Sequence, residues 1–324
     1  MDSFIFALNA VSPIVLMVAI GYFLKRTGIV NGTVSKAVNK IVFKLLLPST
    51  LFLNIYKIES LAHMDFGYIW FAVITVLIVF AVGIPLCCFI TKQHDQRGPI
   101  LQAIFRSNFA LIGLPLATSL FGEEGAMVTT VLSTFAIPLF NILAVISLTV
   151  FFGDKVNVKK IVVGIAKNPL IHSVIIGGIC LAIRVLFVSK GIEFRLTDIE
   201  PLYSVIDQFS KSATPIALLM LGAEFELSAV PVLKKQIIFG TAMRIFVVPS
   251  VALLSAYLLG CFSGAHFAAF VALFGSPVAI SSVSMAQEMG SDSKLAGQLI
   301  VWTTVMSVFT IFFFSFILKE VGVF

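Results

Sequence analysis

A short apolar segment with Gly-x-Pro at its centre occurs twice in this chain. Residues 110–117 read Ala-Leu-Ile-Gly-Leu-Pro-Leu-Ala and residues 272–279 read Ala-Leu-Phe-Gly-Ser-Pro-Val-Ala, so five of the eight positions are identical. The copies lie inside apolar runs, 97–121 and 264–287, that are each roughly long enough to cross a bilayer. Proline interrupts the hydrogen bonding of a helix, and glycine adds backbone freedom at the same point. The pattern therefore predicts two membrane-spanning helices that are broken at Gly-x-Pro.

The composition places the whole chain in a membrane. Hydrophobic residues make up 59% of the 324 residues and charged residues only 12%, whereas soluble domains carry about 25% charged residues. The basic residues lie in short loops between apolar runs, so the net charge of +6 does not indicate a nucleic-acid partner. The four cysteines are not spaced as a disulfide framework or a metal site. We expect no metal and no cofactor.

We expect ten transmembrane helices in the cytoplasmic (inner) membrane. Loops after the odd-numbered spans carry 13 Lys and Arg residues and the other loops carry 4, so the positive-inside rule places both termini outside. The first span is kept as a helix because the N-terminus lacks the basic region of a signal peptide. The approximate spans are 3–24, 34–56, 67–91, 97–121, 125–152, 169–189, 202–223, 231–260, 264–287 and 294–318.

The two halves of the chain align as a repeat of five spans. Residues 129–140 and 303–314 agree at seven of twelve positions, and Pro48 of the second span corresponds to Pro215 of the seventh. Because five is odd, the second copy must cross the membrane in the opposite direction, as in transporters built from inverted repeats.

The predicted repeats cover residues 1–152 and 169–324, joined by a cytoplasmic linker at 153–168. Such a repeat brings the broken helices 4 and 9 together near the centre of the bilayer, where non-helical backbone must be buried or line a wet cavity. Half-helices that begin near Pro115 and Pro277 would direct their amide groups at this crossing, which favours anions. The sequence thus predicts an all-α fold with an anion site at the crossing.

These motifs resemble those of the auxin efflux carrier family, which includes plant PIN carriers and bacterial malate and malonate permeases. Arg106 to Leu116 contains the family's Asn-x-x-x-x-Gly-x-Pro-Leu segment, and Leu47 to Phe52 resembles its helix-two motif. Asn168-Pro169 resembles the start of its helix six, and Gly275 to Ala279 resembles its helix-nine crossover. Ser212 to Gly222 resembles its helix seven.

The resemblance implies a ten-helix fold similar to that of sodium/proton antiporters and bile-acid symporters. It implies a scaffold of helices 1, 2, 6 and 7 (about 3–56 and 169–223) and a transport domain of helices 3–5 and 8–10 (about 67–152 and 231–318). It also implies a homodimer formed through the scaffold and an elevator-type movement of the transport domain. Only about 15 residues connect the halves here, so a small bacterial-type permease fits better than an auxin carrier.

Polar residues near the two breaks are the candidates for substrate or ion binding. A side-chain amide such as that of Asn108 both donates and accepts hydrogen bonds, although it can also tie two helices together. Asn141 and Gln298 are less favoured. The candidate ligands are Asn108, Ser107, Ser276, Ser281, Ser282 and Asn54, and the residues expected to shape the crossover are Gly113, Pro115, Gly275 and Pro277.

Two arginines are candidates for an anion-attracting charge. Arg106 lies nine residues before Pro115, about 13 Å along a helix. It either attracts anions in the inward-facing vestibule or only marks the cytoplasmic interface, and the interface is favoured. Arg244 lies well inside the eighth span. An intramembrane charge marks a functional site by default, but a long side chain can also reach the interface, and the sequence leaves both open.

The leading hypothesis is a secondary transporter of a small organic anion, a mono- or dicarboxylate. The alternative is a sodium-coupled symporter of a larger amphipathic anion. Helix five has no acidic residue between Gly125 and Gly153, which disfavours carboxylate-based proton exchange, and the coupling ion, Na⁺ or H⁺, stays open. An intramembrane enzyme or a sensor is disfavoured, because the sequence has no catalytic Asp pair, no His-Glu-x-x-His and no soluble output domain.

Overall fold

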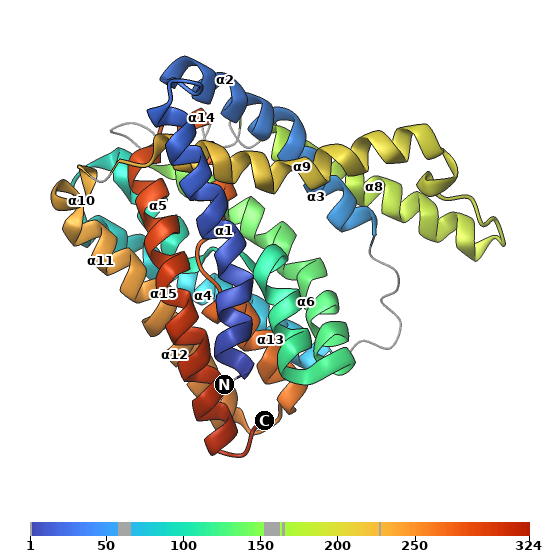
Figure 1. The fold of residues 1–324 in the computed structure, drawn as a ribbon. Helices are drawn as coiled ribbons and strands as arrows, with labels where there is room; N and C mark the ends of the chain where they lie inside the picture. Colours follow the sequence, from blue (N-terminus) through green and yellow to red (C-terminus); the bar gives the residue numbers. More distant parts are fainter. Residues whose placement is uncertain (1, 58–65, 152–162, 164–165, 227) are drawn as a thin grey trace.

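The computed structural model describes residues 2–57, 66–151, 163, 166–226 and 228–324, and this part of the chain is all-helical (Figure 1). The predicted linker lies mostly outside these residues. Among these residues, six helical segments are long and apolar enough to cross a membrane, which confirms the prediction of an all-α polytopic membrane protein. These six are Gly32–Tyr56, Phe66–Ile90, Pro115–Val150, Pro169–Ser189, Lys234–Leu259 and Ser293–Glu320.

The first part of the chain forms three long helical segments. Helix α1 covers Asp2–Arg26. A second segment runs without a break through α2 (Gly32–Ile41), the π-helical turn η1 (Val42–Leu46) and α3 (Leu47–Tyr56). The third segment, α4 (Phe66–Ile90), is the most apolar of the six membrane-length helices.

The first predicted broken helix is interrupted earlier than expected. Helix α5 (His94–Phe105) ends at an extended segment, Arg106–Asn108, after which the π-helical turn η2 (Phe109–Gly113) leads directly into α6 (Leu114–Val150). The backbone of α6 leaves the helical conformation at Phe121–Gly122, so two helices meet there at a kink.

The second part of the chain repeats this pattern of long helices and one break. Here the break, residues 276–280, does fall at the second Gly-x-Pro. The elements are α8 (Pro169–Ser189), η3 (Leu196–Asp198), α9 (Glu200–Glu224), α10 (Ala229–Val232), α11 (Lys234–Ala242), η4 (Met243–Val247), α12 (Val248–Leu259), α13 (Gly264–Gly275), α14 (Ser281–Glu288) and α15 (Ser293–Glu320).

A π-helical turn precedes a proline in three places. Pro48, Pro115 and Pro249 each occupy the second residue of the α-helix that follows η1, η2 and η4 respectively. The proline ring clashes with the carbonyl group four residues earlier and offers no N–H to it. A wider turn moves that carbonyl group aside without ending the helix. The prediction that Pro115 breaks its helix was therefore wrong, because the chain bypasses the clash locally.

Helices α1, α3, α8 and α9 pack against one another, and α1 also packs against α15 and α6. Helix α1 packs against α9, and α3 packs against both α8 and α9. A Cβ atom added at Gly21 would overlap the backbone of α9, and one at Gly222 would overlap that of α1, so these glycines allow the close approach. Helices α8 and α9 extend sideways from the remaining helices, which surround the almost wholly buried α13 (Figure 1).

Candidate functional site

The two breaks lie against each other in the interior. The backbone N–H of Asn108 donates to the carbonyl group of Pro277 at 2.7 Å, and Ser107 forms an antiparallel bridge with Val278. The N–H of Val278 in turn donates to Oγ1 of Thr303 at 3.2 Å. These contacts satisfy extended backbone at a depth where water is scarce. The C-termini of α5 and α13 and the start of η2 therefore converge on one place.

Arg244 holds the ends of both interrupted helices and is fully buried. In α13, its guanidinium donates to the carbonyl groups of Leu273 and Phe274 at 2.8 and 2.9 Å, and just beyond this helix to that of Ser276 at 2.8 Å. It also donates to the carbonyl group of Phe105, the last residue of α5, at 3.2 Å. A cation suits the partial negative charge of a helix C-terminus. Arg244 does not line the cavity at the crossing, so its charge stabilises the fold.

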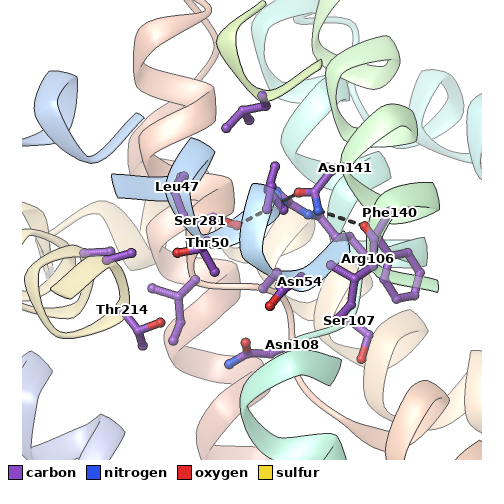
Figure 2. Close-up of a pocket in the computed structure, with 17 residues that line it drawn as sticks. Leu47, Thr50, Asn54, Arg106, Ser107, Asn108, Phe140, Asn141, Thr214 and Ser281 are labelled. Atoms are coloured by element: carbon purple, nitrogen blue, oxygen red, sulfur yellow. Dashed lines mark hydrogen bonds between the residues drawn. The ribbon is translucent and has the colours of Figure 1, made fainter. Parts of the chain in front are cut away.

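A cavity of about 220 Å³ lies beside the first break, between α3, α6 and α9. Figure 2 shows the side chains that surround it, with Asn54 and Thr50 of α3 near those of the break. Asn54, Arg106, Ser107, Asn108 and Ser281 of the predicted set line it. Its polar lining residues are Thr50, Asn54, Arg106, Ser107, Asn108, Asn141, Thr214 and Ser281.

Arg106 is the charged residue of this cavity and is only 2% exposed. Its guanidinium donates to Oδ1 of Asn141 and Oγ of Ser281, both at 2.8 Å (Figure 2). It also donates to Oε1 of Gln102 and Oγ of Ser282, both at 3.1 Å. The expectation that Arg106 marks the cytoplasmic interface was therefore wrong, because the helix ends just before it and the side chain turns into the protein.

The partners of Arg106 are all neutral. Over the described ranges, the ion pairs involve Lys25, Lys57, Lys211 and Lys294, and no carboxylate lies within ion-pair distance of this guanidinium. A buried cation with dipolar partners alone keeps much of its desolvation cost. The site thus has a buried positive charge that neutral groups orient and that no acidic side chain of the described residues neutralises.

Two hydrogen-bond donors of the cavity wall are unused. Oγ of Ser107 and Nδ2 of Asn108 are buried and have no hydrogen-bond partner among the described residues. Both residues follow Arg106 directly, at 5% and 8% exposure. Buried donors of this kind are usually paired, so these two atoms are available to a molecule in the cavity.

The other predicted residues support the site without lining the cavity. The hydroxyl group of Ser276 donates to the carbonyl group of Ala272 at 2.6 Å, and Ser282 accepts from Arg106. Gly275 ends α13, and Pro277 accepts the hydrogen bond from Asn108. Gly113 lies in η2, where an added Cβ atom would overlap the Phe109 ring.

Sequence reasoning gave too little weight to Asn141 and missed Thr50, Thr214 and Gln102. Asn141 is an amide in the apolar second part of α6, and that isolation was a usable signal. Thr50 and Thr214 lie close to the corresponding prolines Pro48 and Pro215, whereas nothing in the sequence distinguishes Gln102. Within the described part of the chain, no three His, Cys, Asp or Glu side chains are grouped to hold a metal ion.

Comparison with known proteins agrees with the fold and the motifs. Residues 6–152 and 155–315 match the model of a family described as membrane transport protein. An uncharacterized transporter of Methanocaldococcus jannaschii is 26% identical, over 96% of this chain and 98% of its own length. An uncharacterized transporter of Methanothermobacter thermautotrophicus is 20% identical over the same shares. The resemblance to the auxin efflux carriers is thereby confirmed, and the chain belongs to this family of multi-pass membrane transport proteins.

Proposed function

We propose that this chain is a secondary transporter of a small organic anion and that Arg106 provides the charge that binds it. The supporting observation is a buried guanidinium that faces a cavity and has no acidic partner in the described ranges. An anion in the cavity would offset the cost of burying this charge. Intramembrane charges that face a cavity are typical of substrate pathways.

A carboxylate fits the donors that surround the cavity. Ser107 and Asn108 contribute the two unused donors, and the backbone amides at the start of η2 add the favourable end of a helix dipole. Part of the cavity lining is apolar and includes Leu47, Leu51 and Phe140. One cation and an apolar wall suit a monocarboxylate with a short apolar body better than a dicarboxylate.

The volume of about 220 Å³ also disfavours the alternative substrate, a larger amphipathic anion. Drug-sized ligands occupy pockets of roughly 300–1,000 Å³. The proposal includes a coupling ion, which is either Na⁺ or H⁺.

We further propose that two inverted five-helix repeats form the fold, with α1, α3, α8 and α9 in the scaffold. The helices follow the ten predicted spans closely, which supports this division. The cavity lies between Asn54 and Thr214 on the scaffold side and Asn108 and Ser281 on the other side. A bound anion would touch both groups of helices, so that sliding of one against the other moves it across the membrane.

The membrane setting completes this proposal. The chain would lie in the cytoplasmic membrane with both termini outside, and two copies would associate through the scaffold. These features rest on the distribution of basic residues and on the family resemblance.

The test is counterflow in proteoliposomes with a panel of mono- and dicarboxylates, with and without a sodium or proton gradient. The wild type should exchange a short monocarboxylate saturably, and Arg106→Gln should reduce uptake about 100-fold, the value of one or two charge-assisted hydrogen bonds. Arg26→Gln is the matched control, since Arg26 is exposed and, among the described residues, its side chain donates hydrogen bonds to Tyr22 alone.

Two results would count against the proposal. Absence of saturable flux for every organic anion would refute the transport of anions. Normal uptake by Arg106→Gln would leave transport in place and refute the assignment of the site.

A further inference from the structure

A second and larger cavity is an open groove on the outer surface of the helix bundle. Its volume is about 930 Å³, and it runs between α11–η4 on one side and α15 on the other. These helices pack side by side at one edge of the molecule (Figure 1). Ile238, Phe246 and Met306 line it and are 57%, 52% and 42% exposed. The groove is therefore a hollow that faces the hydrocarbon of the bilayer.

The groove is about as long as one leaflet of the bilayer is thick. Twelve residues separate Lys234 at one end from Phe246 near the other, which corresponds to about 18 Å along a helix. Half of the hydrocarbon core of a bilayer is about 15 Å. A single phospholipid can therefore lie along the groove, with its headgroup at one end and an acyl chain toward the other.

One end of the groove is basic. Lys234 lines it and the adjacent Lys235 is also exposed. The distribution of basic residues along the chain puts this end at the cytoplasmic face. Each lysine near an anionic headgroup contributes roughly 1 kcal/mol of attraction, so this end favours a negatively charged lipid over a zwitterionic one.

A polar atom lies between the basic end and the apolar body. Oγ1 of Thr241, seven residues beyond Lys234, is buried in the groove wall and has no hydrogen-bond partner in the described part of the chain. In a phospholipid, the ester groups of the glycerol backbone lie between the phosphate and the acyl chains. An ester oxygen is therefore a suitable acceptor for this hydroxyl group.

We propose that this groove binds one anionic phospholipid of the cytoplasmic leaflet. Its phosphate lies at Lys234 and Lys235, its glycerol esters lie near Thr241, and one acyl chain lies against Phe246 and Met306. This proposal does not depend on the identity of the transported substrate. It gives the lipid a role as a structural ligand, because η4 also carries the Arg244 that holds the two interrupted helices.

Tryptophan fluorescence offers a direct test, because the chain has only two tryptophans. Trp302 is half-buried at the groove, whereas Trp70 on α4 is 60% exposed to bulk lipid. The variant Trp70→Phe reports on the groove and Trp302→Phe reports on bulk lipid. Each is reconstituted in phosphatidylcholine that contains an increasing fraction of brominated phosphatidylglycerol, a quencher.

In the Trp70→Phe protein, Trp302 should be quenched at a brominated phosphatidylglycerol fraction far below that needed for Trp70 in the other variant. Brominated phosphatidylcholine should show no such preference. Replacing both Lys234 and Lys235 with Gln should raise the half-quenching fraction about 30-fold, the effect of two lysine–headgroup contacts. The control is the double variant Lys36→Gln/Lys40→Gln, which removes two exposed charges from the same predicted cytoplasmic side of the membrane.

Equal quenching of Trp302 by the two brominated lipids would overturn the proposal. So would a Trp302 that neither lipid quenches, because a protein surface would then cover the groove. An unchanged half-quenching fraction in the Lys234/Lys235 variant would also overturn it.

Discussion

Replacing Arg244 with methionine should remove most of the stability of the protein. The guanidinium donates to four carbonyl groups, those of Phe105, Leu273, Phe274 and Ser276, and it is fully buried. A hydrogen bond to a charged group contributes about 1.5–3 kcal/mol. Four such bonds therefore amount to about 6 kcal/mol at the lower limit, which equals the whole stability of many domains, about 5–15 kcal/mol.

Methionine keeps the apolar stem and supplies no donor. The carbonyl groups at the ends of α5 and α13 would then be buried without partners, at a depth that water does not readily reach. Lysine at the same position retains the charge but has a single nitrogen, which cannot reach both helix ends with the planar fork of arginine. Arg244→Lys should therefore fall between the wild type and Arg244→Met.

The assay is the melting temperature of the purified protein in detergent, followed by fluorescence-detected size-exclusion chromatography. Arg244→Met should melt more than about 10 °C below the wild type or fail to accumulate as a monodisperse species. Arg26→Met is the control, because Arg26 is exposed. A monodisperse Arg244→Met protein that melts with the wild type would refute the capping role.

Three further predictions concern other parts of the molecule. Asn108→Ala should raise the KM for the substrate about tenfold, because one donor is lost, and leave the melting temperature unchanged, because Nδ2 has no protein partner within the described residues. Gly222→Ala should cost about 1–3 kcal/mol of stability, since its Cβ would overlap the backbone of Val18, whereas Gly178→Ala has open space and should not. Asn39 is buried and connects two helices, because it accepts a hydrogen bond from the Ser284 hydroxyl group and donates one to the Glu224 carboxylate. In a protein without the native cysteines that carries Ser284→Cys, adding Asn39→Ala should therefore speed thiol labelling.

The second break could be predicted from sequence and the first could not, for physical reasons. At residues 276–280 the break coincides with Ser-Pro, so a local rule is sufficient. At Arg106–Asn108 there is neither glycine nor proline. There the chain extends because its backbone pairs with Pro277 and Val278 and because Arg244 donates to the carbonyl group at the end of α5. These partners are more than 100 residues away, and no local pattern indicates them.

The roles of the two arginines show the same limit. Both lie in apolar spans, and by sequence alone Arg244 was the stronger candidate for a functional charge because it lies deeper in its span. The structure separates them by the kind of atom each one meets. Arg244 donates to backbone carbonyl groups, which are fixed and take up four of its five N–H donors, whereas Arg106 donates to side-chain amides and hydroxyl groups beside a cavity.

The partners of Arg106 and Arg244 differ in how they would respond to a bound anion. Side-chain hydroxyl and amide groups can rotate to accept from the cation or donate to an anion, while carbonyl groups at a helix end can only accept. The neutral partners of Arg106 can therefore rearrange around a carboxylate, and those of Arg244 cannot. Because Arg244 neutralises the C-termini of α5 and α13, the negative ends of those helices do not repel an anion at the crossing. In the proposed function, Arg244 thus makes the site acceptable to a negative charge, and Arg106, whose partners can rearrange, binds it.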